Sequence, residues 1–553
     1  MPYYITPPPN MPTNGVRDLT PRETIQRARA MACIRKKDPA QCGGQIYVSL
    51  FFDGTGNNMD WEEPGLGTTQ MAAGKHSNIA RLYKAGIDDP ESGFFSHYIP
   101  GVGTPFPEIR DTGGTLGLAA AHMGADRINW AILSVINSVH AYLARSPMLE
   151  GEHAGHTVNA ASKSGLEAWY RRRVLDTWEK KLEAVVKDRE RKVTHINIAV
   201  FGFSRGAATA RVFANWLLQW LEQEDGGYRL AGIPLRIYFM GLFDTVASVG
   251  VADMLPGFDG RMDWATPANL EIHPAVEQCV HFVALHEQRA SFPLELAARA
   301  TQVAYPGMHS DVGGGYRPGE QGKAMPGGAM SSPHLSQVPL IDMHHAALVG
   351  GVPLMSMEEI KETPDVAPDF DCPPALAAAV NNFFDHCGIK TSAKGKDGVV
   401  AVLRSHTLQY LQWRDGLLRP GRLMENRRFF REAHLRTDRA QLREALKDFT
   451  AQLVDLRVWA QDTGVAAVAL DALAKVNPIA GAVLRTTRGR RAGPVDAETL
   501  RMLEAVSLGA TLPPAVQHLM DDYIHDSRAG FRIGGMMEPR ELTDGYFRYR
   551  RVF

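Results

Sequence analysis

The chain has 553 residues, of which 44% are hydrophobic and 22% are charged, and its formal net charge is −1. This composition is ordinary for a soluble globular protein, and the length suits one large domain with additions or two to three ordinary ones. The near-zero charge excludes attraction of the whole molecule to nucleic acid, and five cysteines in a chain of this size exclude a disulfide scaffold.

The beginning of the chain carries no basic segment followed by an apolar core, so we expect no secretory signal peptide. No run approaches the roughly 18 uninterrupted apolar residues of a spanning helix. The sequence therefore predicts a protein that is made soluble in the cytoplasm of the cell that synthesises it. Cys33 and Cys42 are close enough in sequence to form one bridge, although reduced thiols are expected in a cytosolic producer.

Residues 1–44 are rich in proline and then basic, and they predict an N-terminal arm with a short helix over 21–35. The run IYVSLFF at 46–52 is typical of a buried strand. The residues Gly54, Thr55 and Gly56 follow it closely, and small residues at that place would let backbone N–H groups face a reacting oxygen. A plain tight turn is the alternative.

Helices are predicted over 77–83, 129–143 and 166–191, the last one charged and solvated, and a further strand is predicted over 97–103. These elements lead up to the stretch THINIAVFGFSRGAATARVFANWLL, in which an apolar strand runs into a helix rich in small residues.

The turn of that stretch carries a G-x-S-x-G pattern centred on Ser204. Glycines two residues to either side leave room for a strained turn, which is the context of a nucleophile elbow. The serine hydroxyl would then stand clear of the sheet at the positive end of the following helix. The backbone N–H of Arg205, together with one from the loop at 54–56, would receive an oxyanion.

Two later strands end in residues that can serve a nucleophile. The strand predicted over 235–243 ends in Asp244, at the edge where open α/β sheets place their sites, although an aspartate that caps the next helix is the alternative. The strand predicted over 300–305 runs into a glycine-rich loop that carries His309. A further strand, over 279–285, lies between them.

Serine, acid and histidine thus occur in the chain order of the α/β-hydrolase triad. Ser204 would attack an acyl carbonyl, His309 would take and return its proton, and Asp244 would hold the imidazole in the right tautomer. His286 in place of His309, and Asp311 in place of Asp244, remain rival assignments. No metal site and no cofactor is indicated.

The chain from 355 onward is predicted to be mainly helical. Its most apolar piece, at 465–484, lies beside a cluster of arginines, so 465–491 is a candidate contact with a membrane surface, with a core helix and an exposed loop as the alternative. The glycine-rich segment at 319–336 predicts a lid over the acyl site or a disordered loop. His525-Asp526-Ser527 cannot form a triad among themselves, and we expect them to tie the C-terminal segment to the catalytic domain.

The motifs FFDGTGNN, SNIARLY, GFSRGAATAR, GLFDTVASVG and PGMHSDVGGGY, in this order, resemble the catalytic domain of the type VI secretion antibacterial phospholipase effectors. Uncharacterised bacterial and fungal α/β-hydrolases share that domain. The stretches LSQVPLIDMHHAALVGGVPL and YIHDSRAGFR, with GYFRYRRVF at the end of the chain, sharpen the resemblance to the effectors.

The resemblance implies an α/β-hydrolase-like fold with a mostly parallel sheet over 45–354 and a helical part over 355–553. It implies a phospholipase A that cleaves at sn-1 or sn-2, with Ser204, Asp244 and His309 as its triad. It also implies a secretion spike protein or adaptor as carrier, delivery to the periplasm of a rival bacterium, phospholipid membrane as substrate and an immunity protein as partner. A general carboxylesterase or lipase, and an inactive hydrolase fold used as an adaptor, are the alternative functions.

Overall fold

The computed structural model describes most of the chain, namely residues 3–35, 43–114, 117–162, 167–224, 226–247, 264–325, 333–433, 436–461, 497–507, 511–533, 536–537 and 545–553. The candidate membrane segment at 465–491, Cys42 and residues 326–332 of the predicted lid lie outside these ranges.

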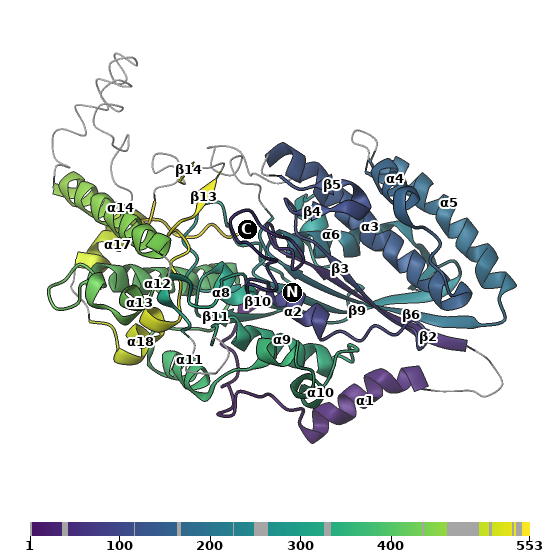
Figure 1. Cartoon of the computed structure of the whole chain (residues 1–553), viewed down its shortest axis with the longest axis horizontal. Coiled ribbons are helices and arrows are strands. Elements are labelled where there is room, and N and C mark those ends of the chain that lie inside the picture. Colours follow the sequence, from purple (N-terminus) through teal and green to yellow (C-terminus); the bar gives the residue numbers. More distant parts are fainter. Residues whose placement is uncertain are drawn as a thin grey trace, which may run out of the picture.

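A central sheet organises the molecule (Figure 1). Its main path consists of parallel strands in the order β11 (Thr301–Tyr305), β10 (Cys279–Ala284), β9 (Ile233–Phe243), β6 (Lys192–Phe203), β2 (Gly43–Phe52) and β3 (Phe94–Ile99). A hairpin of β7 (Glu222–Glu224) and β8 (Gly227–Leu230) adds antiparallel pairing to the start of β9. The chain builds outward from β2 to β3, and then from β6 toward β11, so the order reverses between β2 and β6.

Both faces of the sheet are buried, as its near-continuous apolar strands predict. Successive side chains of a strand point to opposite faces, and β2 sends Ile46, Val48 and Leu50 into one core cluster and Tyr47 and Phe51 into the other. The first cluster lies under α3 (Gly117–Ala144) and α6 (Arg205–Trp220), and the second under α2 (Asn78–Lys84) and α9 (Gln337–Val349). This arrangement confirms the predicted α/β-hydrolase-like fold with a mostly parallel sheet.

Helices of the C-terminal part gather at one end of the sheet, on the left of Figure 1. They include α11 (Pro374–His386), α12 (Lys396–Gly416), α14 (Arg436–Gln461) and α18 (Pro514–Asp522). Side chains of these helices, such as Phe383, Tyr410 and Leu442, belong to the same hydrophobic cluster as Phe51 and Phe201 of the sheet. The apolar core is therefore continuous from the sheet into the C-terminal part.

The N-terminal arm is packed against the rest of the chain. Its strand β1 (Tyr4–Ile5) pairs with β12 (Ala393–Lys394), Thr6 bridges to Val303 of β11, and the helix α1 (Pro21–Arg35) contacts α9. The division into an arm, a catalytic domain and a helical region stays a prediction. Within the described part of the chain, every helix is too short or too polar to cross a bilayer.

Candidate active site

The residues expected to carry chemistry follow the carboxyl ends of strands β2, β6, β9 and β11. In open α/β sheets this edge, near the point where strand order reverses, is where ligands bind. Phe203 pairs in register with Phe243, so Ser204 and Asp244 leave neighbouring strands at the same level. The main chain ties the two together, because the Ser204 N–H donates to the Phe243 carbonyl at 3.0 Å and the Val246 N–H donates to the Ser204 carbonyl at 3.2 Å.

Ser204 occupies a strained turn between β6 and α6. Its φ of 58° and ψ of −125° lie in a region that side-chain-bearing residues rarely adopt. The serine is 4% exposed, and α6 begins with the next residue. The hydroxyl therefore stands at the positive end of a 16-residue helix, where developing negative charge is stabilised.

The two glycines of the elbow are required by close packing. A Cβ at Gly202 would lie 2.6 Å from both the Ala207 Cα and the Gly206 carbonyl oxygen. A Cβ at Gly206 would lie 2.3 Å from the carbonyl oxygens of Phe52 and Asp53, at the end of β2. The elbow thus rests directly on the loop that follows β2.

Asp244 is a fully buried carboxylate with four hydrogen bonds. Its Oδ1 accepts from the Ala284 N–H at 2.9 Å and from Arg550 Nη1 at 2.8 Å, and its Oδ2 accepts from Arg550 Nη2 at 2.7 Å and from His309 Nδ1 at 2.5 Å. Burial by itself would raise the pKa of Asp244, but the positive charge of Arg550 and the hydrogen bond from His309 bring that pKa well below its ordinary value. The acid is therefore ionised at neutral pH.

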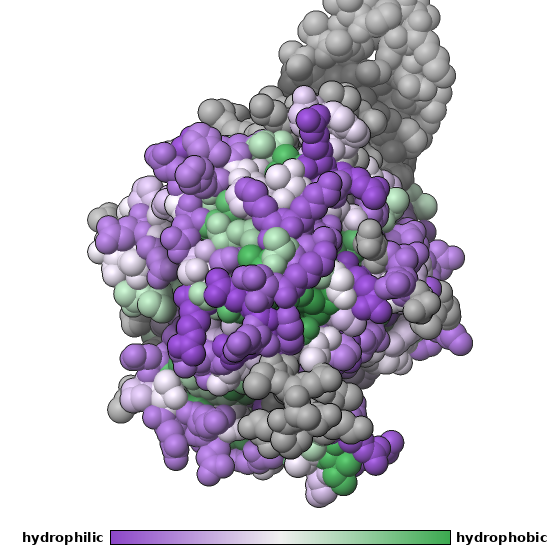
Figure 2. All heavy atoms as spheres, turned by 90° about the vertical axis from the view of Figure 1, so that its right-hand side faces the viewer, coloured by the Kyte–Doolittle hydropathy of each residue, from purple (hydrophilic) through white to green (hydrophobic). Residues whose placement is uncertain are grey.

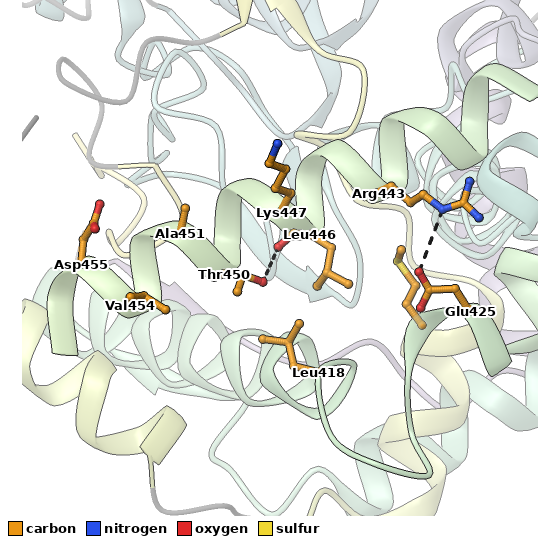
Figure 3. A pocket seen from close by; sticks show the side chains of 10 residues that line it. Leu418, Glu425, Arg443, Leu446, Lys447, Thr450, Ala451, Val454 and Asp455 are labelled. Carbon is orange, nitrogen blue, oxygen red and sulfur yellow. Dashed lines mark hydrogen bonds and ion pairs between the residues drawn. The ribbon is translucent and has the colours of Figure 1, made fainter. Parts of the chain in front are cut away.

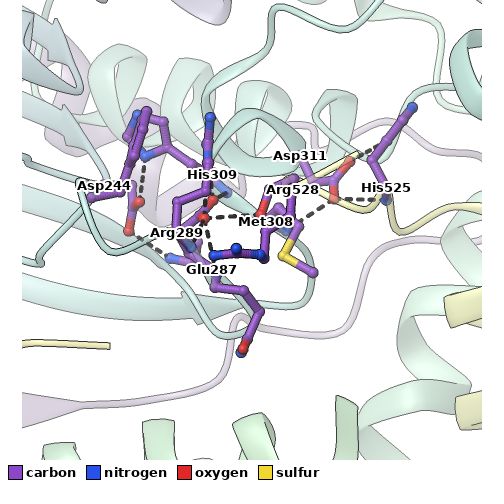
Figure 4. Close-up of polar contacts among 12 residues, drawn as sticks. Asp244, Glu287, Arg289, Met308, His309, Asp311, His525 and Arg528 are labelled. Carbon is purple, nitrogen blue, oxygen red and sulfur yellow. Dashed lines mark hydrogen bonds and ion pairs between the residues drawn. The ribbon is translucent and has the colours of Figure 1, made fainter. Parts of the chain in front are cut away.

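His309 begins the short helix α8 (His309–Gly313), and its ring lies against Phe203 and Phe292 with centroid separations of 4.6 and 4.9 Å. Burial lowers the pKa of His309 below its ordinary value, although Asp244 opposes this effect. The imidazole is then neutral at neutral pH, with its proton on Nδ1 facing the carboxylate (Figure 4). Nε2 is buried and makes no hydrogen bond to the described residues, so it is available as a base.

The structure brings Asp244 and His309 together and places Ser204 on the strand beside Asp244. Among the described residues, no hydrogen bond joins Ser204 Oγ to His309 Nε2. Such catalytic hydrogen bonds are commonly long without substrate and tighten in the reacting complex. The serine nucleophile therefore stays a prediction, whereas the pairing of acid and base is observed.

The oxyanion candidates narrow to two backbone groups. The Gly54 N–H already donates to Asp53 Oδ1 at 2.7 Å, and the Gly56 N–H donates to the Val102 carbonyl at 3.1 Å. Within the described part of the chain, the N–H groups of Thr55 and Arg205 have no hydrogen-bond acceptor. Of the loop 54–56, from which one N–H is predicted to receive the oxyanion, the Thr55 amide is therefore the candidate that fits this arrangement, together with Arg205. The oxyanion role of both amides stays a prediction.

The side chain of Arg205 links the elbow to the loop after β2, since its Nε donates to the Thr55 hydroxyl. Burial, together with the neighbouring Arg127, lowers the pKa of Arg205 to about 10, so the guanidinium remains charged at neutral pH. The two candidate oxyanion donors are therefore held by a direct contact between their residues.

Asp53 shapes the loop after β2 from inside the protein. It accepts hydrogen bonds from the Ser77 hydroxyl and the Tyr98 hydroxyl, both at 2.5 Å, in addition to the bond from Gly54. Burial raises the pKa of Asp53 to about 6, although the hydrogen bonds act in the opposite direction. The described residues contain no group of His, Cys, Asp and Glu side chains that could hold a metal ion.

Both rival assignments for the triad are disfavoured by their contacts. His286 Nδ1 accepts from the Gly307 N–H at 2.9 Å, and its ring lies against Phe383 and His406 of the C-terminal part. Asp311 Oδ1 is bonded to His525 Nδ1 at 2.6 Å. His286 and Asp311 therefore make their hydrogen bonds to residues other than Asp244 and His309, which disfavours both as members of the triad.

The segment His525-Asp526-Ser527 ties the C-terminal part to the site, as expected. His525 pairs with Asp311 (Figure 4). Asp526 accepts from Arg414, and the Ser527 hydroxyl donates to Glu287 at 2.9 Å. Glu287 in turn accepts the backbone N–H of His309 at 3.1 Å and is paired with Arg289. Glu287, Arg289 and Arg550 were not predicted as site residues, because nothing in their local sequence indicates that they meet residues far away in the chain.

A groove of about 650 Å³ lies elsewhere, along α14 (Figure 3). Its lining includes Leu418, Met424, Leu446 and Val454, and it carries none of the candidate triad residues.

The fold and the site define the α/β-hydrolase-like class. The sheet is mostly parallel and flanked by helices, a serine lies in a strand-to-helix turn, and an acid and a histidine follow later strands. The family model described as the type VI secretion system (T6SS) phospholipase effector Tle1-like catalytic domain matches residues 48–220 and 222–346. That match covers more than half of the chain, and the protein belongs to this family.

The solved structures that are similar to the chain include the following two. An uncharacterised protein from Pseudomonas aeruginosa matches with a TM-score of 0.75 and 26% identity, over 100% of this chain and 85% of that one. The Tle1 effector bound to the VgrG spike of the type VI secretion system matches with a TM-score of 0.31 and 22% identity, over 50% of this chain and 52% of that one. No curated protein sequence matches the chain.

Proposed function

We propose that the protein is a serine phospholipase A that hydrolyses acyl esters of membrane glycerophospholipids. The observation that carries the proposal is the 2.5 Å hydrogen bond between His309 Nδ1 and Asp244 Oδ2, on the sheet edge that also holds Ser204 in a strained turn. Membership of the phospholipase effector family supports a phospholipid as substrate.

The proposed reaction assigns one role to each residue of the triad. Ser204 Oγ attacks the acyl carbon while His309 Nε2 takes the hydroxyl proton, and Asp244 stabilises the imidazolium that forms. The tetrahedral intermediate breaks its bond to the glycerol oxygen, which takes the proton from Nε2 and leaves as a lysophospholipid. Water then attacks the acyl-enzyme in the same way and releases the fatty acid.

The oxyanion of both tetrahedral intermediates would lie at the backbone N–H groups of Arg205 and Thr55. Removal of one such donor typically costs about 10²–10³-fold in kcat. Proline is the one ordinary substitution that removes a backbone N–H, but it also fixes φ and would disturb the loop or the helix start. The side-chain contact between Arg205 and Thr55 can be changed without altering the backbone of this part of the site.

The experiment is positional product analysis on a phosphatidylglycerol with two different acyl chains. Wild-type protein should release fatty acid, and the identity of the released chain separates sn-1 from sn-2 cleavage. Ser204→Ala should lower the rate by at least about 10³-fold. The matched control Ser405→Ala, whose hydroxyl donates to the Ala401 carbonyl within α12, should keep the wild-type rate. An unchanged rate in Ser204→Ala would refute the assignment, and activity limited to short p-nitrophenyl esters would favour a general carboxylesterase.

We further propose that the protein is an antibacterial toxin, carried by a secretion spike protein or adaptor into the periplasm of a rival cell, with an immunity protein guarding the producer. Membership of a T6SS effector family supports this proposal. A producer that carries Ser204→Ala should no longer inhibit a susceptible rival, and equal inhibition by both producers would contradict a lipase-based toxicity.

A further inference from the structure

The last residues of the chain lie against the segment that follows β10. Val552 forms a parallel bridge with Leu294, and three main-chain hydrogen bonds hold this pairing. The Leu294 N–H donates to the Arg551 carbonyl at 2.9 Å, the Phe553 N–H to the Leu294 carbonyl at 2.9 Å, and the Leu296 N–H to the Phe553 carbonyl at 3.2 Å. The segment 550–553 is thus docked by its backbone.

This docking delivers the guanidinium of Arg550 to the candidate catalytic acid. Its two terminal nitrogens bond both oxygens of Asp244, at 2.8 and 2.7 Å, and its Nε donates to the Phe292 carbonyl at 2.8 Å. The side chains of Arg550 and Asp244 are 3% and 0% exposed, and 306 residues separate them in the chain. A fork of this kind fixes the plane of a carboxylate as well as its charge.

We infer that Arg550 is a positioning residue of the active site, which holds Asp244 ionised and correctly oriented and thereby sets the orientation and basicity of His309. This inference rests on the proposed serine hydrolase function. It also means that the site is complete only when residues 550–553 are docked.

The electrostatic requirement follows from burial. A fully buried carboxylate loses its hydration and needs a permanent positive partner to stay charged. His309 is neutral at neutral pH and supplies a hydrogen bond rather than a charge, and Arg289 is already paired with Glu287. Arg550 is therefore the cation that compensates Asp244.

The same cation weakens the base. An imidazole beside a free carboxylate gains a proton readily, and a positive charge bound to the same carboxylate, as Arg550 is bound to Asp244, opposes that gain. The other ionisable groups near this pair are the Glu287–Arg289 pair and His281 of β10, which Arg211 of α6 in turn influences. Beyond the effect of burial, Arg289 lowers the pKa of His309 and Glu287 raises it. Burial lowers the pKa of His281 to about 3. Burial alone would raise the pKa of Glu287, but Arg289 brings it to about 2, so neither group titrates with His309.

The test compares Arg550→Gln, Arg550→Lys and the neighbouring control Arg551→Gln in the full-length protein. The pH dependence of kcat/KM is measured for each variant, with the folded fraction from thermal unfolding. Arg550→Gln should lower kcat/KM per folded molecule by at least about 10²-fold. The acid limb should also move to higher pH, because the Asp244–His309 pair binds a proton more readily once the positive charge beside Asp244 is gone. Arg550→Lys keeps the charge without the fork, so it should keep the acid limb near the wild-type position with a loss of about tenfold.

Each outcome decides between roles. If Arg550→Gln is too unstable to assay, the position of the acid limb in Arg550→Lys is the deciding measurement. An acid limb that moves clearly to higher pH in Arg550→Lys, although the positive charge is kept, overturns the inference. If Arg550→Gln only lowers the folded fraction, with kcat/KM per folded molecule and the acid limb unchanged, the pair is merely structural. A failure of the proposed function looks different, because the wild-type protein itself would then hydrolyse no ester.

Discussion

The contact between the elbow and the loop after β2 leads to a sharp prediction at Gly206. A Cβ at this position would lie 2.3 Å from the carbonyl oxygens of Phe52 and Asp53, both of them backbone atoms that cannot rotate away. Ordinary contacts between such atoms are longer than 3.4 Å. Gly206→Ala must therefore push the start of α6 and the end of β2 apart by about 1 Å.

That displacement has two measurable consequences. Overpacking of this kind costs about 1–3 kcal/mol, of which the better helix propensity of alanine returns up to about 1 kcal/mol. Because Ser204 and the two candidate oxyanion amides belong to the segments that separate, kcat/KM for a phospholipid should fall by about 10²-fold, the usual effect of a misplacement of this size.

The matched control is Gly416→Ala, at the end of α12, where no atom lies within 4 Å of the position that a Cβ would take. We expect the control to keep wild-type activity and to be as stable as wild type or slightly more stable. The assays are urea unfolding and phospholipid hydrolysis per folded molecule. Wild-type activity and an unchanged unfolding midpoint in Gly206→Ala would refute the view that the elbow needs this contact.

Three further predictions concern ionisable groups. Because burial lowers the pKa of His309 below 6.5, kcat/KM should be half-maximal below pH 6.5, and a half-maximal point above that value would contradict a buried base. His525→Ala removes the partner of Asp311 and should lower the free energy of unfolding by about 1.5–3 kcal/mol in urea, so an unchanged midpoint would show that the pair contributes nothing. Burial raises the pKa of Asp53 from 3.8 to about 6. Between pH 3.8 and about pH 6 the folded protein keeps the Asp53 proton that the unfolded chain has lost, so the free energy of unfolding falls as the pH rises through this range. Relative to Asp53→Asn, the wild type should lose about 3 kcal/mol between about pH 4 and about pH 7, and parallel stability curves would exclude this titration.

The sequence was most informative where structure is local. The apolar run at 46–52 and the strand before Ser204 are patterns that a buried parallel strand imposes on its own residues, and both strands are present in the sheet. The chain order of Ser204, Asp244 and His309 was readable because each follows its own strand, and parallel strands deliver their carboxyl ends to one edge.

The parts that the sequence did not predict depend on contacts between distant segments. Arg550 reaches Asp244 across 306 residues, and nothing in GYFRYRRVF distinguishes it from its arginine neighbours. Which amide of the loop is free to bind an oxyanion could not be predicted from the sequence either. It depends on whether Asp53 and Val102 accept hydrogen bonds from the N–H groups of Gly54 and Gly56. Hydrogen bonds of this kind form only when the chain has folded, so the local sequence does not reveal them.

The most direct test of the central claim is covalent labelling of Ser204 by a fluorophosphonate, located by mass spectrometry of the digested protein. The account predicts a single adduct on the peptide that contains Ser204, absent in Ser204→Ala and strongly slowed in His309→Ala, because the serine is nucleophilic only with its base. An adduct on another serine, or labelling of Ser204 at the wild-type rate in His309→Ala, would contradict it.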